Sequence, residues 1–217
     1  MKAVLFDFDG VLLDSQIPLF DRLRKTLGYK GVVVTCDDLL KWYIGMSSNE
    51  IYTAIIEKYC LDTSIQELRA DNHRYNGNYY QTETLIPLPC YKELLKLLKT
   101  SGIRTAIVSS TISKNILYAL NRLSALRYFD AIVCGDMIDK GKPSPEGYLA
   151  ASDLLGISPS DCLVIEDSPV GIQAAKNADI PVIGYKGSKY VQNTSHADFQ
   201  IYSSDDLFEF IRTNIQK

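Results

Sequence analysis

Two aspartates, Asp7 and Asp9, stand close together in an apolar run near the start of the chain. The segment from Ala3 to Phe8 is apolar except for Asp7, and without polar alternation it predicts a strand buried on both faces. An ionised carboxylate at the end of such a strand costs free energy unless something neutralises it. A bound cation, or a reaction that needs a carboxylate, would explain why these residues stand there.

Other polar residues follow the later predicted strands. The run IRTAIVSS ends in two serines, DCLVIED ends in two acids, and a lysine follows DAIVCG within DKGKPSPE. Ligands of open α/β sheets bind beyond the carboxyl ends of the strands, so we expect these side chains to share one edge of a sheet. This edge group comprises Asp7, Asp9, Ser109, Ser110, Lys142, Glu166 and Asp167.

The crowding of acids and the types of their neighbours suggest a chemistry for this edge. Neighbouring carboxylates repel one another and raise each other's pKa unless a cation lies among them. Oxygen ligands completed by water favour magnesium over zinc. Lys142 and Ser109 suit the binding of a tetrahedral anion such as phosphate. A carboxylate aimed at the phosphorus would then attack it and form an aspartyl-phosphate.

The elements that must position these residues alternate from Lys92 onward. Helical periodicity in YKELLKLLKTSG, SKNILYALNRLSAL, SPEGYLAASDLLG and SPVGIQAAKNAD separates the short apolar strands IRTAIVSS, DAIVCG, DCLVIED and IPVIGY. The segment SSDDLFEFIRTNI predicts a closing amphipathic helix. This order predicts an α/β fold with a Rossmann-like parallel sheet that helices cover on both faces.

The segment between the first strand and this alternation differs in pattern. LFDRLRKTLG, SSNEIYTAIIEKYC and SIQELRADNHRYNGNYY show helical spacing, and the segment contains no convincing strand. We therefore predict two domains. Residues 1–15 and 85–217 form the Rossmann-like catalytic core, and residues 16–84 form an inserted helical domain.

Composition limits the classes of binding partner and indicates the cellular compartment. A net charge of −3 favours neither nucleic acid nor an anionic membrane, and 46% hydrophobic residues can form a sizeable core. The five scattered cysteines predict reduced thiols, and His73 and His196 form no metal or triad pattern. The chain opens on a strand with no signal-peptide layout, so we expect a cytoplasmic protein, and we expect it to be a monomer.

Four segments in this order, DFDGVLLDS, IVSS, GKPSPE and VIEDSPVGIQAAKNA, resemble the signature motifs of the haloacid dehalogenase superfamily. They look like its β-phosphoglucomutase-like and phosphoglycolate-phosphatase-like branch, in which the helical insert is a cap. The resemblance implies that Asp7 is the nucleophile and that Asp9 is the general acid and then the general base.

The same resemblance assigns the remaining edge residues. Ser109 and Lys142 become phosphate ligands, and Ser110 is a weaker candidate for the same pocket. The alternative is that Ser109 only caps the following helix. Thr111 or Ser113 is better placed for that role. Magnesium would be held by Asp7, the backbone carbonyl of Asp9, Glu166 (directly or through water) and Asp167.

The resemblance favours a phosphatase of a small phosphorylated metabolite. A dehalogenase needs neither the second aspartate nor magnesium, a phosphonatase needs a cap lysine in a motif that we do not find, and a silent binding protein would have lost a motif residue. The main alternative is a β-phosphoglucomutase-like sugar phosphate mutase. Its cap grips the distal phosphate with cationic residues, and here those positions hold Leu19, Ile44 and Ser48.

Overall fold

The computed structural model describes residues 1–43, 46 and 48–215. The chain forms two compact units, which we call the core unit (Met1–Asp14 with Leu85–Lys217) and the cap unit (Ser15–Thr84). Ile44, one of the three cap positions named above, lies outside the described residues. Within the described part of the chain, no helix is both long and apolar enough to cross a bilayer.

A parallel sheet of six strands forms the centre of the core unit, in the order β3-β2-β1-β4-β5-β6. This confirms the predicted α/β fold with a parallel sheet. The final strand, β6, was not predicted because it is only three residues long and two of them, Phe199 and Gln200, are exposed. The strands are β1 (Ala3–Phe6), β2 (Arg104–Ser109), β3 (Ala131–Cys134), β4 (Cys162–Glu166), β5 (Val182–Tyr185) and β6 (Phe199–Ile201).

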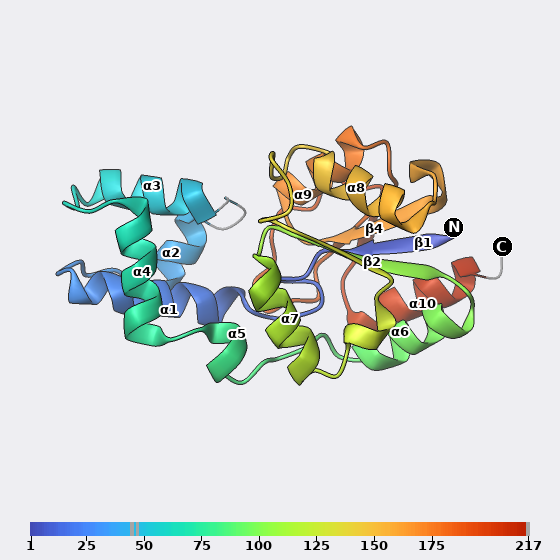
Figure 1. The fold of residues 1–217 in the computed structure, drawn as a ribbon, viewed down its shortest axis with the longest axis horizontal. Coiled ribbons are helices and arrows are strands. Elements are labelled where there is room, and N and C mark those ends of the chain that lie inside the picture. The colour runs from blue at the N-terminus through green and yellow to red at the C-terminus, as the bar shows by residue number, and fades with distance from the viewer. Residues whose placement is uncertain (44–45, 47, 216–217) are drawn as a thin grey trace. The chain divides into compact units, whose positions relative to one another are not determined.

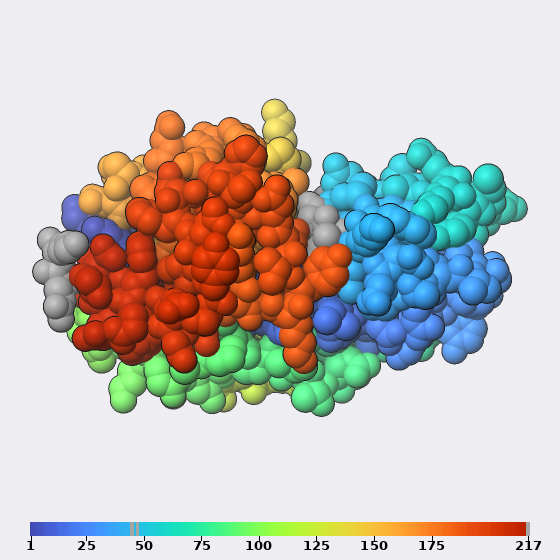
Figure 2. All heavy atoms as spheres, turned by 180° about the vertical axis from the view of Figure 1, so that it is seen from behind, coloured from blue at the N-terminus to red at the C-terminus, as the bar shows by residue number. Residues whose placement is uncertain are grey.

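Helices cover both faces of this sheet (Figure 1). On one face lie α8 (Glu146–Leu155) and α9 (Pro169–Asn177). On the other lie α6 (Tyr91–Thr100), α7 (Ser113–Arg122) and α10 (Ser204–Ile215). Seen from behind, red α10, the orange-red segment before it and green α6 make up most of the visible face of the core unit (Figure 2). The short 3-10 helices Leu126–Tyr128 and Pro159–Asp161 lead into β3 and β4.

Strand β1 is central because it pairs on both sides. Phe6 is in register with Ile107 of β2 and with Ile165 of β4. All four residues of β1 are fully buried, as the unbroken apolar run predicts for a strand covered on both faces. The residues that directly follow β1, beginning with Asp7, are therefore attached to a fully buried strand.

The chain leaves the core unit and returns to it at adjacent points. Asp14 donates its backbone N–H to the carbonyl of Ile86 at 2.8 Å, and Leu88 donates to the carbonyl of Leu12 at 3.0 Å. Leu13 and Pro87 form an antiparallel bridge between these two hydrogen bonds. The two connecting segments thus form a short ladder that belongs to the core unit.

The cap unit is helical. Its helices are α1 (Gln16–Tyr29), α2 (Cys36–Tyr43), α3 (Ser48–Lys58), α4 (Ile65–Asn76) and α5 (Tyr79–Thr82). The sequence pattern did not separate α5 from α4, but Gly77 ends α4 with a φ of 70°, a conformation that glycine adopts without steric cost. The buried Arg22 of α1 holds this turn, because its guanidinium donates to the carbonyls of Asn76 and Gly77, both at 2.6 Å.

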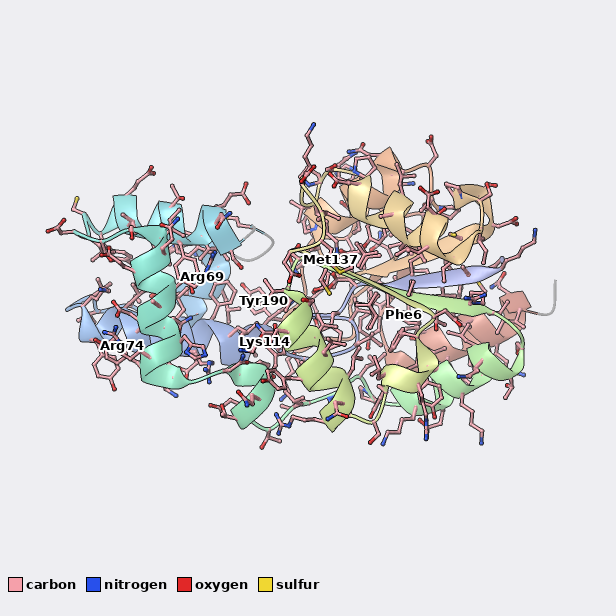
Figure 3. The ribbon with its side chains drawn as sticks, in the orientation of Figure 1. Phe6, Arg69, Arg74, Lys114, Met137 and Tyr190 are labelled. Atoms are coloured by element: carbon pink, nitrogen blue, oxygen red, sulfur yellow. The ribbon has the colours of Figure 1, made fainter. Side chains whose placement is uncertain are left out.

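Two arginines of α4 are also held within the cap unit (Figure 3). Arg69 donates to the Asn49 side chain at 2.9 Å and lies over the ring of Tyr52. Arg74 is exposed and forms an ion pair with Asp71 at 3.4 Å.

Candidate active site

Three carboxylates meet at the carboxyl edge of the sheet. Asp7 directly follows β1, and its backbone N–H donates to the carbonyl of Ile165 in β4 at 2.9 Å. Because β4 runs parallel to β1, its last residue, Glu166, and the following Asp167 emerge beside Asp7. All three are buried, and one oxygen from each lies within 4.8 Å of the others. The structure therefore brings together three of the four acids singled out in the sequence.

Lys142 lies among these acids. Its ammonium nitrogen is 2.5 Å from Asp7 Oδ1 and 2.6 Å from Glu166 Oε1, and it also donates to the carbonyl of Val108 at 3.1 Å. Burial alone would lower the pKa of Lys142, but the charges of Asp7 and Glu166 outweigh it and hold the pKa well above the usual value. Lys142 is therefore a permanent positive charge between the two acids.

One lysine does not balance the whole acidic cluster. Burial raises the pKa of Asp7, and repulsion from Glu166 adds to the effect, while Lys142 opposes both. A cation beside Asp7 and Asp167 would remove this cost, and three carboxylate oxygens are the ligand type that Mg²⁺ prefers. The residues present thus fit a magnesium ion, which Asp7 and Asp167 could hold directly and Glu166 directly or through water.

Glu166 is fixed by hydrogen bonds to both of its oxygens. Oε1 accepts from Lys142 and from the Tyr148 hydroxyl at 3.2 Å, and Oε2 accepts from the backbone N–H and hydroxyl of Ser168 at 2.9 and 3.0 Å. The carboxylate also rests directly on Gly171 of α9, where a Cβ atom would lie 1.6 Å from Oε1. Glu166 therefore acts in this structure as an anchor for Lys142.

Asp9 is not a member of the three-acid cluster. The chain turns sharply after it, because Gly10 has a φ of 95° and donates its N–H to the carbonyl of Leu13 at 2.7 Å. The half-buried Asp9 carboxylate accepts a hydrogen bond from the hydroxyl of Thr111 at 2.7 Å. A carboxylate oriented in this way suits proton transfer to and from a reacting group.

The serines after β2 differ in their surroundings. Ser109 is buried and its hydroxyl accepts from the backbone N–H of Thr111 at 3.0 Å, whereas Ser110 is exposed. Both line a small cavity together with Lys142 and Tyr148. Hydroxyl groups beside a fixed ammonium group can hold the oxygens of a phosphate.

Three residues near these side chains escaped the sequence analysis. Thr111 had been considered only as a cap for α7, but Asp136 has this role, because its carboxylate accepts from the backbone N–H and hydroxyl of Ser113, both at 2.7 Å. In the sequence, Tyr148 looks like an ordinary apolar residue of the predicted helix SPEGYLAASDLLG. Gln192, whose amide donates to Asp167 at 3.0 Å, lies in no motif. No signal in a single sequence separates it from a surface glutamine.

The match to a family model settles the class of protein. Residues 4–185 match the model of the haloacid dehalogenase-like hydrolases, and the chain belongs to that family. Among its relatives is a phosphorylated carbohydrates phosphatase of Thermotoga maritima, 33% identical over 83% of this chain and 82% of that protein. The β-phosphoglucomutase of Bacillus subtilis is 34% identical over 85% of this chain and 83% of its own length.

Two further comparisons extend over almost the whole chain. The phosphoglycolate phosphatase of Aquifex aeolicus is 27% identical over 99% of both proteins. The crystal structure of β-phosphoglucomutase from Clostridium difficile matches with a TM-score of 0.82 at 24% identity, over 100% of this chain and 97% of that one. This structural likeness shows the fold. The family match and the phosphatases among the relatives identify the chain as an enzyme of this hydrolase family.

Proposed function

We propose that this enzyme is a magnesium-dependent phosphatase that hydrolyses a small phosphomonoester through an aspartyl-phosphate on Asp7. The observation that carries the proposal is the position of Lys142, a buried cation in contact with both Asp7 and Glu166 at the carboxyl edge of the sheet. A lysine in this place can screen the nucleophile from the negative charge of a phosphate. Magnesium, held by Asp7, Asp167 and the backbone carbonyl of Asp9, would neutralise further phosphate oxygens.

In the first chemical step, a carboxylate oxygen of Asp7 attacks the phosphorus, and the bond from phosphorus to the ester oxygen breaks. Asp9 donates its proton to the leaving alkoxide, while the Thr111 hydrogen bond holds the Asp9 carboxyl group in place. Lys142 and Ser109 bind the phosphate oxygens during the transfer.

In the second step, Asp9 takes a proton from a water molecule, and the resulting hydroxide attacks the phosphorus. The bond between phosphorus and the Asp7 oxygen breaks, which releases inorganic phosphate and restores both carboxyl groups. The same acid thus serves first as a donor and then as an acceptor of a proton.

The alternative is a sugar phosphate mutase, in which a bound sugar phosphate attacks the aspartyl-phosphate in place of water. Relatives with each activity are almost equally similar to this chain, so similarity alone does not choose between them. Two features favour hydrolysis. The positions expected to carry mutase cations hold Leu19, Ile44 and Ser48, and Arg69 is already bonded to Asn49.

The test is incubation with β-glucose 1-phosphate, magnesium and a glucose bisphosphate primer, beside a phosphate-release screen over sugar phosphates, phosphoglycolate, nucleotides and polyol phosphates. We expect inorganic phosphate from one or more monoesters and negligible glucose 6-phosphate, with all activity lost in EDTA. Each charge-assisted hydrogen bond to phosphate contributes about 1.5–3 kcal/mol, so the loss of two would weaken the grip of a mutase by roughly two to four powers of ten. Glucose 6-phosphate forming faster than phosphate would replace this proposal with the mutase.

A further inference from the structure

The segment between β5 and β6 places an amide against an acid of the active site. Gln192 donates from Nε2 to Asp167 Oδ2 at 3.0 Å, and both side chains are more than nine-tenths buried. A carboxylate oxygen can accept but not donate when ionised, so this contact requires the NH₂ end of the amide to face Asp167. The orientation of the Gln192 side chain is thereby determined by its neighbour.

The position of Gln192 is enforced by packing elsewhere in the same segment. Gly184 of β5 stands in register with Glu166 of β4. A Cβ atom on Gly184 would lie 2.5 Å from the Cβ of Thr194, so glycine is needed there to let the segment approach the sheet. Thr194 is fully buried in this notch. Its docking brings Gln192, two residues earlier, to the carboxyl end of β4.

We propose that Gln192 is a positioning residue that orients Asp167 for the metal. By donating to Oδ2, its amide restricts rotation of the Asp167 carboxylate. The inference rests on the proposed function, because it takes Asp167 to be a magnesium ligand. Partners that orient metal ligands in this way contribute about 10–100-fold to metal affinity or activity.

The test measures metal binding directly, without substrate and without turnover. Mg²⁺ is titrated calorimetrically into the full-length protein, and Mn²⁺ binding is followed by electron paramagnetic resonance. The variant Gln192→Met keeps the length of the side chain but removes the donor. Gln173→Met makes the same change at an exposed position of α9, where the amide donates to Asn177 of the same helix. Gln192→Asn, which withdraws the amide by one methylene group, is measured as a second variant in case the first does not fold.

We expect the Mg²⁺ dissociation constant to rise by about 10-fold in Gln192→Met and to stay within about twofold of wild type in Gln173→Met. At saturating magnesium, the KM of Gln192→Met for a phosphomonoester should change little. A general loss of structure would instead raise this KM. Equal affinity in folded Gln192→Met and wild type would overturn the inference and leave the phosphatase proposal standing. A wild-type protein that binds neither ion would overturn both.

Discussion

Replacing Gly171 by alanine puts a methyl group where the Glu166 carboxylate now lies. The added Cβ would be 1.6 Å from Oε1 and 2.0 Å from Cδ of Glu166, far inside van der Waals contact. Gly171 is in the first turn of α9, and its N–H donates to the Ser168 hydroxyl at 3.1 Å, so the backbone cannot simply withdraw. The Glu166 side chain must move instead.

The stability cost follows from this overlap. Overpacking a buried site costs about 1–3 kcal/mol. In a protein of this size each kcal/mol lowers Tm by about 2–4 °C, so we expect Tm to fall by about 2–12 °C. Gly28→Ala is the matched control, because that glycine also lies in a helix but has nothing within 4 Å of an added Cβ. It should raise stability by up to about 1 kcal/mol, since alanine favours helix.

The cost to catalysis is separate from the cost to stability. A displaced Glu166 no longer holds Lys142 at 2.6 Å, and Lys142 then shifts relative to Asp7. A misplacement of about 1 Å in an active site can cost about 100-fold in rate, so kcat should fall by about 10–100-fold at temperatures where the variant is folded. The assay is phosphate release alongside thermal unfolding by circular dichroism. Wild-type kcat and Tm in Gly171→Ala would refute the reasoning that Glu166 anchors Lys142.

Two further predictions concern single groups. Asp7→Asn keeps the shape of the side chain but removes the proposed nucleophile, so phosphate release should fall by at least about 10⁴-fold with an unchanged circular dichroism spectrum. A phosphoryl group trapped on any other residue would contradict the assignment. Burial raises the pKa of both Cys134 and Cys162 to about 11, and only the thiolate reacts with a disulfide reagent. At neutral pH such a reagent should therefore label the exposed Cys60 and Cys90 and reach the two buried thiols only after unfolding; their labelling in the native protein, detected by mass spectrometry, would contradict this.

Much of the core unit could be read from the sequence, because its strands are short apolar runs that glycine, proline and helix-capping residues separate. Helix α9, with Pro169 at its first position, lies within the predicted SPVGIQAAKNAD. The exceptions are short elements. Strand β6 has three residues and buries only Ile201. In the cap unit, α2 has eight residues and begins with Cys36 and two aspartates, although it buries Leu39, Leu40 and Tyr43. Such elements depend on tertiary contacts that a local pattern does not record.

The candidate site could be predicted only as far as its motifs extend. Residues at strand ends, such as Asp7 and Glu166, follow from the rule that parallel strands present their carboxyl ends at one edge. The groups that hold them do not. Thr111 reaches Asp9 over 102 positions of the chain, and Gln192 reaches Asp167 from an irregular segment. Their roles depend on side-chain direction, which spacing in the sequence does not encode.

The short ladder that joins residues 12–14 to residues 86–88 has a consequence for the evolution of this architecture. The segments that enter and leave the helical insert pair with each other. The insert is therefore joined to the core unit at two closely spaced points of the chain, whatever its own length. Insertions are tolerated best where their ends lie close together. Evolution can therefore lengthen, rebuild or exchange the intervening helices while the acidic edge of the sheet stays unchanged. The ladder makes the helical insert an interchangeable module.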